Sequence, residues 1–308
     1  MKKNLFLGFI AFVALAVTSC TNDDVNEFIP QEQAIEFGTY VGRDAQSRAT
    51  ATDLDALKVS GFNVFAYLHA PSVDPTYTAT PFMNNQAVTW KTTVWDYTPK
   101  KYWPTDDNQL DFLAYGPSGV GTPQLTTDNK PGLSIAINTD AANQKDIVVA
   151  APVTEQTKTD GTVEFTFSHI LSRIDFQVVA AGTTVEVNSV TIKGKFVPNG
   201  VVDLTTGDID GTVSATDLTY SLTVNPSGTP YMMIIPVELT NAQVTINYTM
   251  TYEGGAPVVA GTCEGNISKT FEKGKAYTVK ATISDAIAFS VIDNFGWSNA
   301  GEPNVPVN

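Results

Sequence analysis

The chain has 308 residues, of which 43% are hydrophobic and 16% charged, and its formal net charge at pH 7 is −14. Such an acidic chain repels nucleic acid and anionic lipid, so we expect neither as a partner. A chain of this length can bury a hydrophobic core without covalent cross-links, and it favours two domains of ordinary size.

The first residues have the pattern of a secretory signal peptide. Lys2 and Lys3 precede an apolar run over residues 5–17 that is broken only by Gly8. A helix that spans a bilayer needs roughly 20 residues, so this run is too short for a stable membrane span. The pattern therefore predicts a signal peptide over residues 1–19.

A single cysteine follows the apolar run. Val17-Thr18-Ser19-Cys20 places small residues before the thiol and resembles the lipobox of lipoprotein signal peptides. We therefore expect a lipid on Cys20, whose acyl chains anchor the protein to the outer membrane at the cell surface. The alternative is an ordinary signal peptide with a chance cysteine. Removal of residues 1–19 takes away two lysines and moves the net charge from −14 to −16.

The residues after Cys20 are polar and acidic. Asp23, Asp24 and Glu27 resemble the surface-export signal of some bacterial lipoproteins, and the alternative is a solvated tether. The second cysteine, Cys263, has no partner once Cys20 carries a lipid. We therefore expect no intrachain disulfide, even in an oxidising compartment.

Most of the remaining sequence alternates apolar and polar residues with a period of two. This period is typical of β-strands with one buried and one solvated face. The clearest examples cover residues 163–168, 173–178, 244–252 and 277–283. The best helix candidate is short, over residues 53–58, with Thr52 as its N-cap.

The pattern predicts an all-β fold of two tandem sandwiches. One run of strands ends near residue 169 and another opens at Ile174, so the boundary falls between residues 170 and 171. The expected parts are residues 20–48 as an N-terminal segment, 49–170 as the first sandwich and 171–308 as the second.

The sequence holds little that indicates catalysis, and we expect no enzyme, no cofactor and no metal site. The two histidines are His69, expected in a loop, and His169, at the end of a strand on its apolar phase. Neither has metal-ligand spacing with another His or a Cys. Asp208-Ile209-Asp210-Gly211 resembles the start of a calcium loop but lacks the completing glutamate, so we expect a β-turn there.

Aromatic residues cluster in one stretch of the first half. Such rings could form a platform on which sugars stack, but each ring also buries enough area to dominate a small core, and we favour the core. The residues concerned are Trp90, Trp95, Tyr97, Tyr102 and Trp103.

Several segments along nearly the whole chain follow one another in a characteristic order. The most specific combination joins Tyr102-Trp103-Pro104 to the run over residues 110–117. The other segments are Ile35-Glu36-Phe37, Arg48-Ala49-Thr50, and residues 61–67, 146–150 and 165–174. In this order and spacing they resemble the fimbrillin family of type V pilus subunits.

The resemblance implies a structural subunit of a cell-surface fimbria made of two transthyretin-like β-sandwiches. Its partners would be other fimbrillin subunits, of its own kind or in stalk, anchor or tip positions. An Arg-specific protease would cut near the N-terminus, the first strand would leave, and a C-terminal segment of a neighbour would fill the groove. The alternative function is a monomeric surface lipoprotein that binds glycan through the aromatic cluster.

The residues that match the family's processing site are Arg48 and Ala49, with Arg43 as a second candidate. A cut after Arg48 would release residues 20–48, whose strand carries Ile35, Phe37 and Tyr40. The donor segment would begin near residue 285. The donor side chains expected on this basis are Ala286, Ala288, Val291, Ile292, Phe295 and Trp297.

Overall fold

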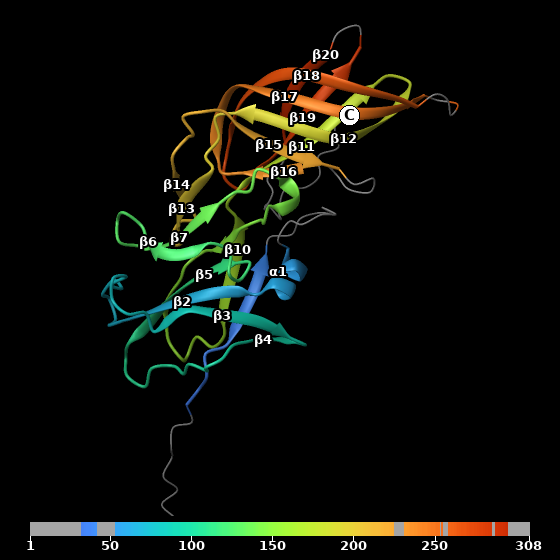
Figure 1. The fold of residues 1–308 in the computed structure, drawn as a ribbon. Helices are drawn as coiled ribbons and strands as arrows, with labels where there is room; N and C mark the ends of the chain where they lie inside the picture. Colours follow the sequence, from blue (N-terminus) through green and yellow to red (C-terminus); the bar gives the residue numbers. More distant parts are fainter. Residues whose placement is uncertain are drawn as a thin grey trace, which may run out of the picture. The chain divides into compact units, whose positions relative to one another are not determined.

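The computed structural model describes residues 32–41, 53–224, 231–252, 254, 258–284 and 287–294. Within them the fold is almost entirely β, which confirms the predicted class (Figure 1). The helices among the described residues are α1 (Leu54–Ser60) and the 3-10 helix η1 (Ala141–Asn143). Several residues singled out from the sequence lie outside the described ones: Cys20, Arg43, Arg48, Ala49, Ala286, Phe295 and Trp297.

The largest sheet has eight strands and contains the first strand of the described chain. Its hydrogen-bonded order is β1-β10-β8-β5-β2-β3-β4, and β9 also pairs with β5. The bounds are β1 (Phe37–Val41), β2 (Phe62–His69), β3 (Met83–Lys91), β4 (Val94–Asp96), β5 (Gln109–Gly116), β8 (Val148–Ala150), β9 (Val153–Gln156) and β10 (Val163–His169).

Three four-stranded sheets complete the fold, in the orders β14-β13-β7-β6, β15-β12-β17-β18 and β16-β11-β19-β20. The first of them joins strands from both sides of the expected boundary at residue 170. The bounds are β6 (Thr122–Leu125), β7 (Pro131–Ala136), β11 (Ser172–Ala180), β12 (Thr183–Gly194), β13 (Asn199–Asp203), β14 (Ile209–Gly211), β15 (Leu218–Thr223), β16 (Tyr231–Ile234), β17 (Val237–Tyr252), β18 (Val258–Phe271), β19 (Ala276–Ile283) and β20 (Ile287–Asp293).

The period-two segments form the strands that the sequence predicts. In β10 every second residue is buried, from Val163 to His169, and in β17 the buried residues include Val244 and Ile246. The central strands β2 and β5 are buried almost without interruption, because both of their faces are covered. The expected loop at His69 is therefore wrong, since this residue is the buried last position of β2.

Helix α1 begins one residue later than the sequence analysis expects. Asp53 is its N-cap, because the Asp53 carboxylate accepts a hydrogen bond of 2.7 Å from the backbone N–H of Ala56. The prediction of Thr52 as the N-cap is wrong for this reason. The helix ends at Ser60, and its C-cap is Gly61, whose φ of 72° is a conformation that favours glycine.

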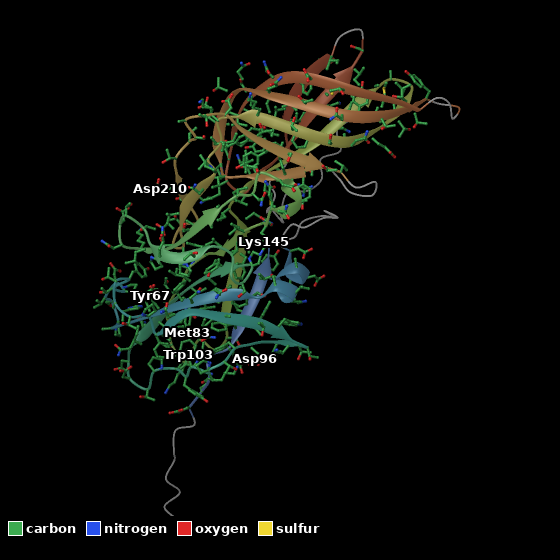
Figure 2. All side chains as sticks on the ribbon, viewed as in Figure 1. Tyr67, Met83, Asp96, Trp103, Lys145 and Asp210 are labelled. Carbon is green, nitrogen blue, oxygen red and sulfur yellow. The ribbon has the colours of Figure 1, made fainter. Side chains whose placement is uncertain are left out.

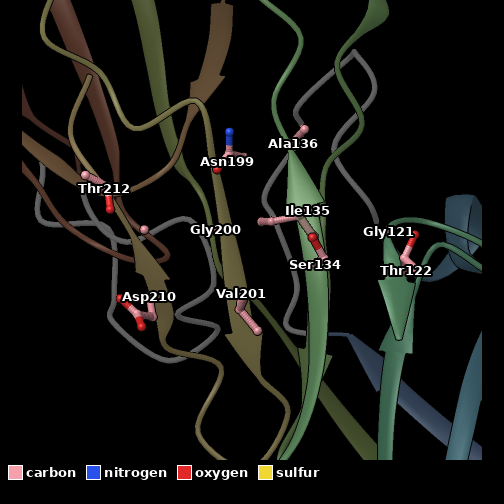
Figure 3. A pocket seen from close by; sticks show the side chains of 11 residues that line it. Gly121, Thr122, Ser134, Ile135, Ala136, Asn199, Gly200, Val201, Asp210 and Thr212 are labelled. Carbon is pink, nitrogen blue, oxygen red and sulfur yellow. The ribbon is translucent and has the colours of Figure 1, made fainter. Parts of the chain in front are cut away.

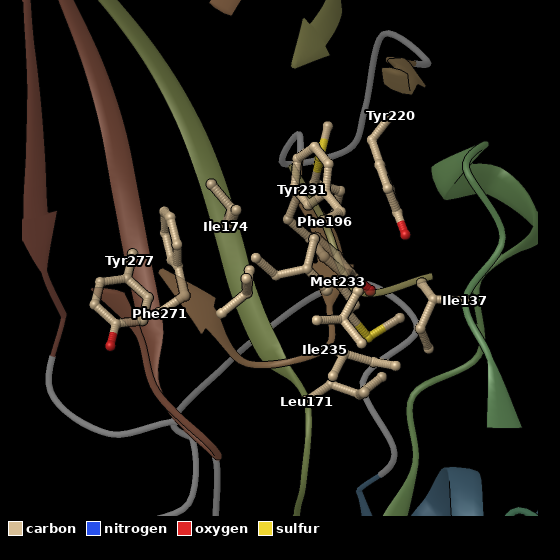
Figure 4. Packing of buried hydrophobic residues seen from close by; sticks show 14 of the residues in the cluster. Ile137, Leu171, Ile174, Phe196, Tyr220, Tyr231, Met233, Ile235, Phe271 and Tyr277 are labelled. Atoms are coloured by element: carbon tan, nitrogen blue, oxygen red, sulfur yellow. The ribbon is translucent and has the colours of Figure 1, made fainter. Parts of the chain in front are cut away.

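The buried apolar residues form two clusters, which meet in the central strands of the large sheet. One face of β2, with Phe62 and Val64, belongs to a cluster built from the first part of the chain. The other face, with Phe65 and Tyr67, belongs to a larger cluster that reaches Ala281. Figure 4 shows part of the larger cluster, around Ile174, Phe196, Met233, Phe271 and Tyr277.

The outer edge of β16 is closed by a side chain. The amide of Gln144 accepts a hydrogen bond of 2.7 Å from the backbone N–H of Met233 and donates one of 2.9 Å to its carbonyl. The same amide nitrogen also donates to the carbonyl of Asn138, at 2.9 Å. At Met233, Gln144 thus takes the place that a neighbouring strand would occupy.

Among the described residues, no helix has both the length and the apolar character needed to cross a membrane.

Candidate functional site

The first strand, β1, contributes directly to the hydrophobic core. Ile35, just before the strand, is fully buried, and Phe37 is 5% exposed. The Phe37 ring stacks on Phe165 with a centroid distance of 5.7 Å and lies 5.3 Å from the ring of Tyr97. Edge-to-face contacts with Phe112 at 6.1 Å and with Phe62 at 6.2 Å complete its surroundings.

The backbone of the N-terminal segment is held on two sides. Strand β1 pairs in parallel with β10, from Phe37 opposite Val163 to Val41 opposite Phe167. Just before the strand, the N–H of Ile35 donates to the carbonyl of Lys101 at 2.9 Å. The N–H of Trp103 donates to the carbonyl of Gln33 at 3.0 Å. The segment therefore contacts two parts of the chain that are distant in sequence.

Two aromatic side chains add polar contacts to the same segment. The indole N–H of Trp95 donates to the hydroxyl of Thr39 at 2.9 Å, and the hydroxyl of Tyr97 donates to the carbonyl of Ile35 at 2.9 Å. Burial raises the pKa of Tyr97, although a hydrogen bond with the backbone of Lys101 opposes the shift. Tyr97 therefore remains a neutral hydrogen-bond donor at physiological pH.

Departure of β1 would expose a large apolar surface. Burial of one large apolar side chain stabilises a fold by about 1.5–3 kcal/mol. Removal of Ile35 and Phe37 would therefore destabilise the core unless other apolar side chains took their positions. Tyr40, the third residue expected to contribute, is 48% exposed. The expectation for Tyr40 is wrong, because its position in the alternating strand points to solvent.

The C-terminal strand β20 lies at the edge of its own sheet, antiparallel to β19. Of the expected donor residues in it, Ala288 and Ile292 are exposed and Val291 is half-buried. Phe289, which the sequence analysis did not select, shares the inward phase with Val291 and packs against the larger core cluster. The alternation of inward and outward positions along β20 would have been enough to predict that Phe289 points inward.

The aromatic cluster is mostly core. Trp95, Tyr97 and Trp103 are 6%, 4% and 5% exposed, which confirms the core prediction for these three residues (Figure 2 labels Trp103). Trp90 is half-buried and meets Trp95 edge to face at 5.1 Å. For Tyr102 the core prediction is wrong, since this side chain is 41% exposed.

Each histidine forms a buried pair with an aspartate. His169 Nδ1 lies 2.7 Å from a carboxylate oxygen of Asp146, and His69 Nε2 lies 3.0 Å from one of Asp111. Burial alone would lower the pKa of His69, but the hydrogen bond and charge of Asp111, together with backbone carbonyls, outweigh it and raise the pKa. The carboxylate of Asp111 also accepts from the backbone N–H of Glu155 at 2.7 Å, so this pair ties β2, β5 and β9 together.

The segment that resembles a calcium loop is mostly strand, because Ile209–Gly211 form β14, and the turn lies before it at residues 204–206. The N–H of Gly207 donates to the carbonyl of Asp203 at 2.7 Å, and Asp208 forms an ion pair of 2.5 Å with Lys273. The prediction of a turn at residues 208–211 is therefore wrong, since the turn precedes them and joins β13 to β14. Among the described residues, no group of three or more His, Cys, Asp or Glu side chains is placed to hold a metal ion.

A pocket of about 510 Å³ lies over the sheet of β6, β7, β13 and β14 (Figure 3). Its lining mixes backbone at Gly200 and Gly211 with short side chains such as Ser134 and Ala136, and Asp210 is the charged residue in it. The pocket has no aromatic wall, and nothing in it indicates a particular ligand.

The chain belongs to the fimbrillin-like family, whose model matches residues 47–295. It is 26% identical to "Fimbrium subunit Fim1C" of Phocaeicola vulgatus, in an alignment that covers 97% of this chain and 98% of that protein. A solved fimbrial protein from Bacteroides vulgatus has the same fold, with a TM-score of 0.62 at 22% identity over 85% of this chain and 99% of the other.

Proposed function

We propose that the chain is a structural subunit of a cell-surface fimbria that supports adhesion, without catalytic activity, and that it assembles with other fimbrillin subunits by strand exchange. The observation that carries this proposal is β1, an edge strand whose first residue, Phe37, fills the core together with Ile35 just before it. The relative named as a fimbrium subunit aligns over nearly all of both chains and supports the same assignment.

The proposed precursor is anchored and then cut. A lipid on Cys20 holds it on the outer membrane, and an Arg-specific protease cuts between Arg48 and Ala49. The cut lies only seven residues beyond Val41, the last residue of β1. Cleavage therefore leaves β1 held by non-covalent contacts alone. The remaining subunit would consist of sandwiches over residues 49–170 and 171–308, divided between His169, where β10 ends, and Ser172, where β11 begins.

The proposed donor is the C-terminal segment of a neighbouring subunit, from about residue 285 onward. Strand β20 is already extended and lies at a sheet edge. Its apolar residues Phe289 and Val291 are spaced two apart, as Ile35 and Phe37 are in the segment to be replaced. A strand with this spacing can fill alternate positions of the groove while its backbone pairs with β10.

The test compares processing with polymerisation. The chain is expressed in its native host as wild type, Arg48→Ala and Arg43→Ala, and polymer is sheared from the cell surface. We expect wild-type and Arg43→Ala polymer to begin at Ala49 and to run as a ladder on gels without heating. Arg48→Ala should stay monomeric and attached to the lipid, and Arg43→Ala is its matched control.

Two outcomes would contradict the proposal. Polymer that still begins at Cys20 would show that the first segment is not removed. Arg48→Ala polymer that is indistinguishable from wild type would show that cleavage at this arginine is not needed for assembly.

A further inference from the structure

A second pocket lies apart from β1, where the chain between β2 and β3 meets β6 and β7. Its volume is about 270 Å³. The rings of Tyr67, Tyr77, Pro81 and Pro123 line it, and the exposed side chains of Asn84 and Gln124 stand at its rim. Figure 2 labels Tyr67, which lies in β2. We call this the tyrosine pocket.

The two tyrosines hold each other in place. Their rings meet edge to face, with a centroid distance of 4.9 Å and an interplanar angle of 85°. Tyr67 is only 4% exposed, because the rest of its ring belongs to the larger core cluster. A ring fixed in this way presents a preorganised apolar wall to a ligand.

Tyr67 is buried as a residue and lines the pocket, and its hydroxyl makes no hydrogen bond to a described residue. This hydroxyl is not among the fully buried polar atoms that lack a partner. The side-chain amides of Asn84 and Gln124 likewise make no hydrogen bond to a described residue. The pocket thus combines apolar rings with three polar groups that are free to bind a ligand.

The charges around the pocket restrict what it can hold. Burial raises the pKa of Tyr77, and the negative charges of Asp111, Asp203 and Asp74 raise it further. Lys130, which precedes the lining residue Pro131, lies 3.6 Å from Asp203. The charges that act on Tyr77 are therefore carboxylates, and they disfavour an anionic ligand.

We propose that the tyrosine pocket binds one neutral pyranose ring of a glycan. A pyranose has apolar C–H faces that fit against the tyrosine and proline rings. Its hydroxyl groups both donate and accept, as the amides of Asn84 and Gln124 and the hydroxyl of Tyr67 require. The size of the pocket suits a single ring. This site is separate from the aromatic cluster around Trp95, and it does not depend on strand exchange.

A proline-rich peptide is the rival occupant, because such segments also dock on tyrosine and proline surfaces. The last residues of the given sequence include Pro303-Asn304-Val305-Pro306. However, this stretch also carries Glu302, which the three aspartates would repel. The charges therefore favour the neutral sugar.

The test uses the full chain, purified in a zwitterionic detergent that has no sugar headgroup. The probes are the methyl pyranosides of glucose, galactose, mannose and N-acetylglucosamine, with N-acetylneuraminic acid as the anionic comparator. Saturation-transfer NMR detects binding and titration gives Kd. We expect at least one neutral pyranoside to bind, with a Kd in the millimolar range, and the anionic sugar not to bind.

Two variants test whether the sugar binds in the tyrosine pocket. Tyr67→Phe keeps the ring and removes the hydroxyl, so it should weaken binding about 3- to 10-fold, the range of one neutral hydrogen bond. Tyr77→Ala should weaken it at least about 10-fold, because the wall is lost. The matched controls are Tyr252→Phe and Tyr102→Ala, at tyrosines that are 42% and 41% exposed, and both should bind as wild type does. The melting temperature of each variant verifies that it is folded.

The proposal is overturned if none of the four neutral sugars binds, or if folded Tyr67→Phe and Tyr77→Ala bind as wild type does. Equal binding of N-acetylneuraminic acid would also overturn it. A peptide with the sequence of residues 301–308 that binds where no sugar does, and loses binding in Tyr77→Ala, would assign the pocket to a peptide. Failure of polymerisation in Arg48→Ala leaves the sugar result unaffected, so the two proposals can be judged separately.

Discussion

The indole nitrogen of Trp95 and the hydroxyl of Thr39 form a 2.9 Å hydrogen bond between β4 and β1, which lie at opposite ends of the strand order in the large sheet. Trp95 is 6% exposed, so its N–H depends on this one partner. We expect Thr39→Val to lower the free energy of unfolding by about 1–3 kcal/mol, because a buried donor is left unsatisfied. Urea unfolding of the unprocessed chain measures this effect. Thr39→Ser keeps the hydroxyl and is the control, and equal stability of the two variants would contradict the expectation.

Phe37→Ala should destabilise the unprocessed chain by about 3–5 kcal/mol, since an aromatic side chain is lost from a packed core. Tyr40→Ala is the control in the same strand and should change stability by less than about 0.5 kcal/mol, because Tyr40 is 48% exposed. If processing removes residues 20–48, polymer assembled from Phe37→Ala should dissociate at the same temperature as wild-type polymer. A polymer weakened by Phe37→Ala would mean that β1 stays in the assembled subunit.

Lipidation is expected to require Cys20. The Cys20→Ala variant should lose palmitate labelling in cells and be recovered from the medium or periplasm. Cys263→Ala is the matched control and should keep the label, because Cys263 is a free, fully buried thiol. A label that persists in Cys20→Ala would place the anchor at another residue.

Trp103→Ala should destabilise the chain by about 3–5 kcal/mol, as aromatic truncations in a core do. The neighbouring Tyr102→Ala should be nearly neutral, because the side chain is 41% exposed. Thermal or urea unfolding compares the two variants. Unchanged stability of Trp103→Ala together with lost glycan binding would instead indicate that the aromatic cluster is a binding surface.

Stability should also depend on pH through His69. The pKa of His69 is raised in the folded chain, whereas in the unfolded chain it is about 6.5. A raised pKa stabilises the fold fully below the unfolded value, and this contribution is lost as the pH rises through the folded value. We therefore expect the stability difference between wild type and His69→Gln to shrink when urea unfolding is repeated from about pH 5.5 to about pH 8.5. A difference that stays constant over this range would contradict the expectation.

Strand positions were predictable from sequence because a strand with one solvated face must alternate. The runs in β10 and β17 show this, and their buried phases are the expected ones. The alternation of apolar and polar residues disappears in a strand whose two faces are both buried. In β2, Phe62 and Phe65 contribute to different clusters, so the sequence of the strand is a nearly continuous apolar run. The polar His69 at the end of this run therefore suggested the start of a loop, although it is the last residue of the strand.

The candidate site was predictable only in part. The apolar residues Ile35 and Phe37 mark a strand, but its partner is more than 120 residues away, and local patterns carry no information about such a pairing. The pairing of His69 with Asp111 depends on register between β2 and β5 in the same way. The inward position of Phe289, in contrast, could have been predicted from local sequence, because it follows from the alternation along β20.

The amide of Gln144, which occupies both backbone groups of Met233, has a consequence for the geometry of a growing fibre. A subunit that exposes several unpaired strand edges can recruit a new chain at each of them, and its polymers would branch or form tangled aggregates. Closure of the β16 edge by a side chain of the same molecule removes one such branch point. A subunit that adds partners through a single vacated groove can extend in only one line.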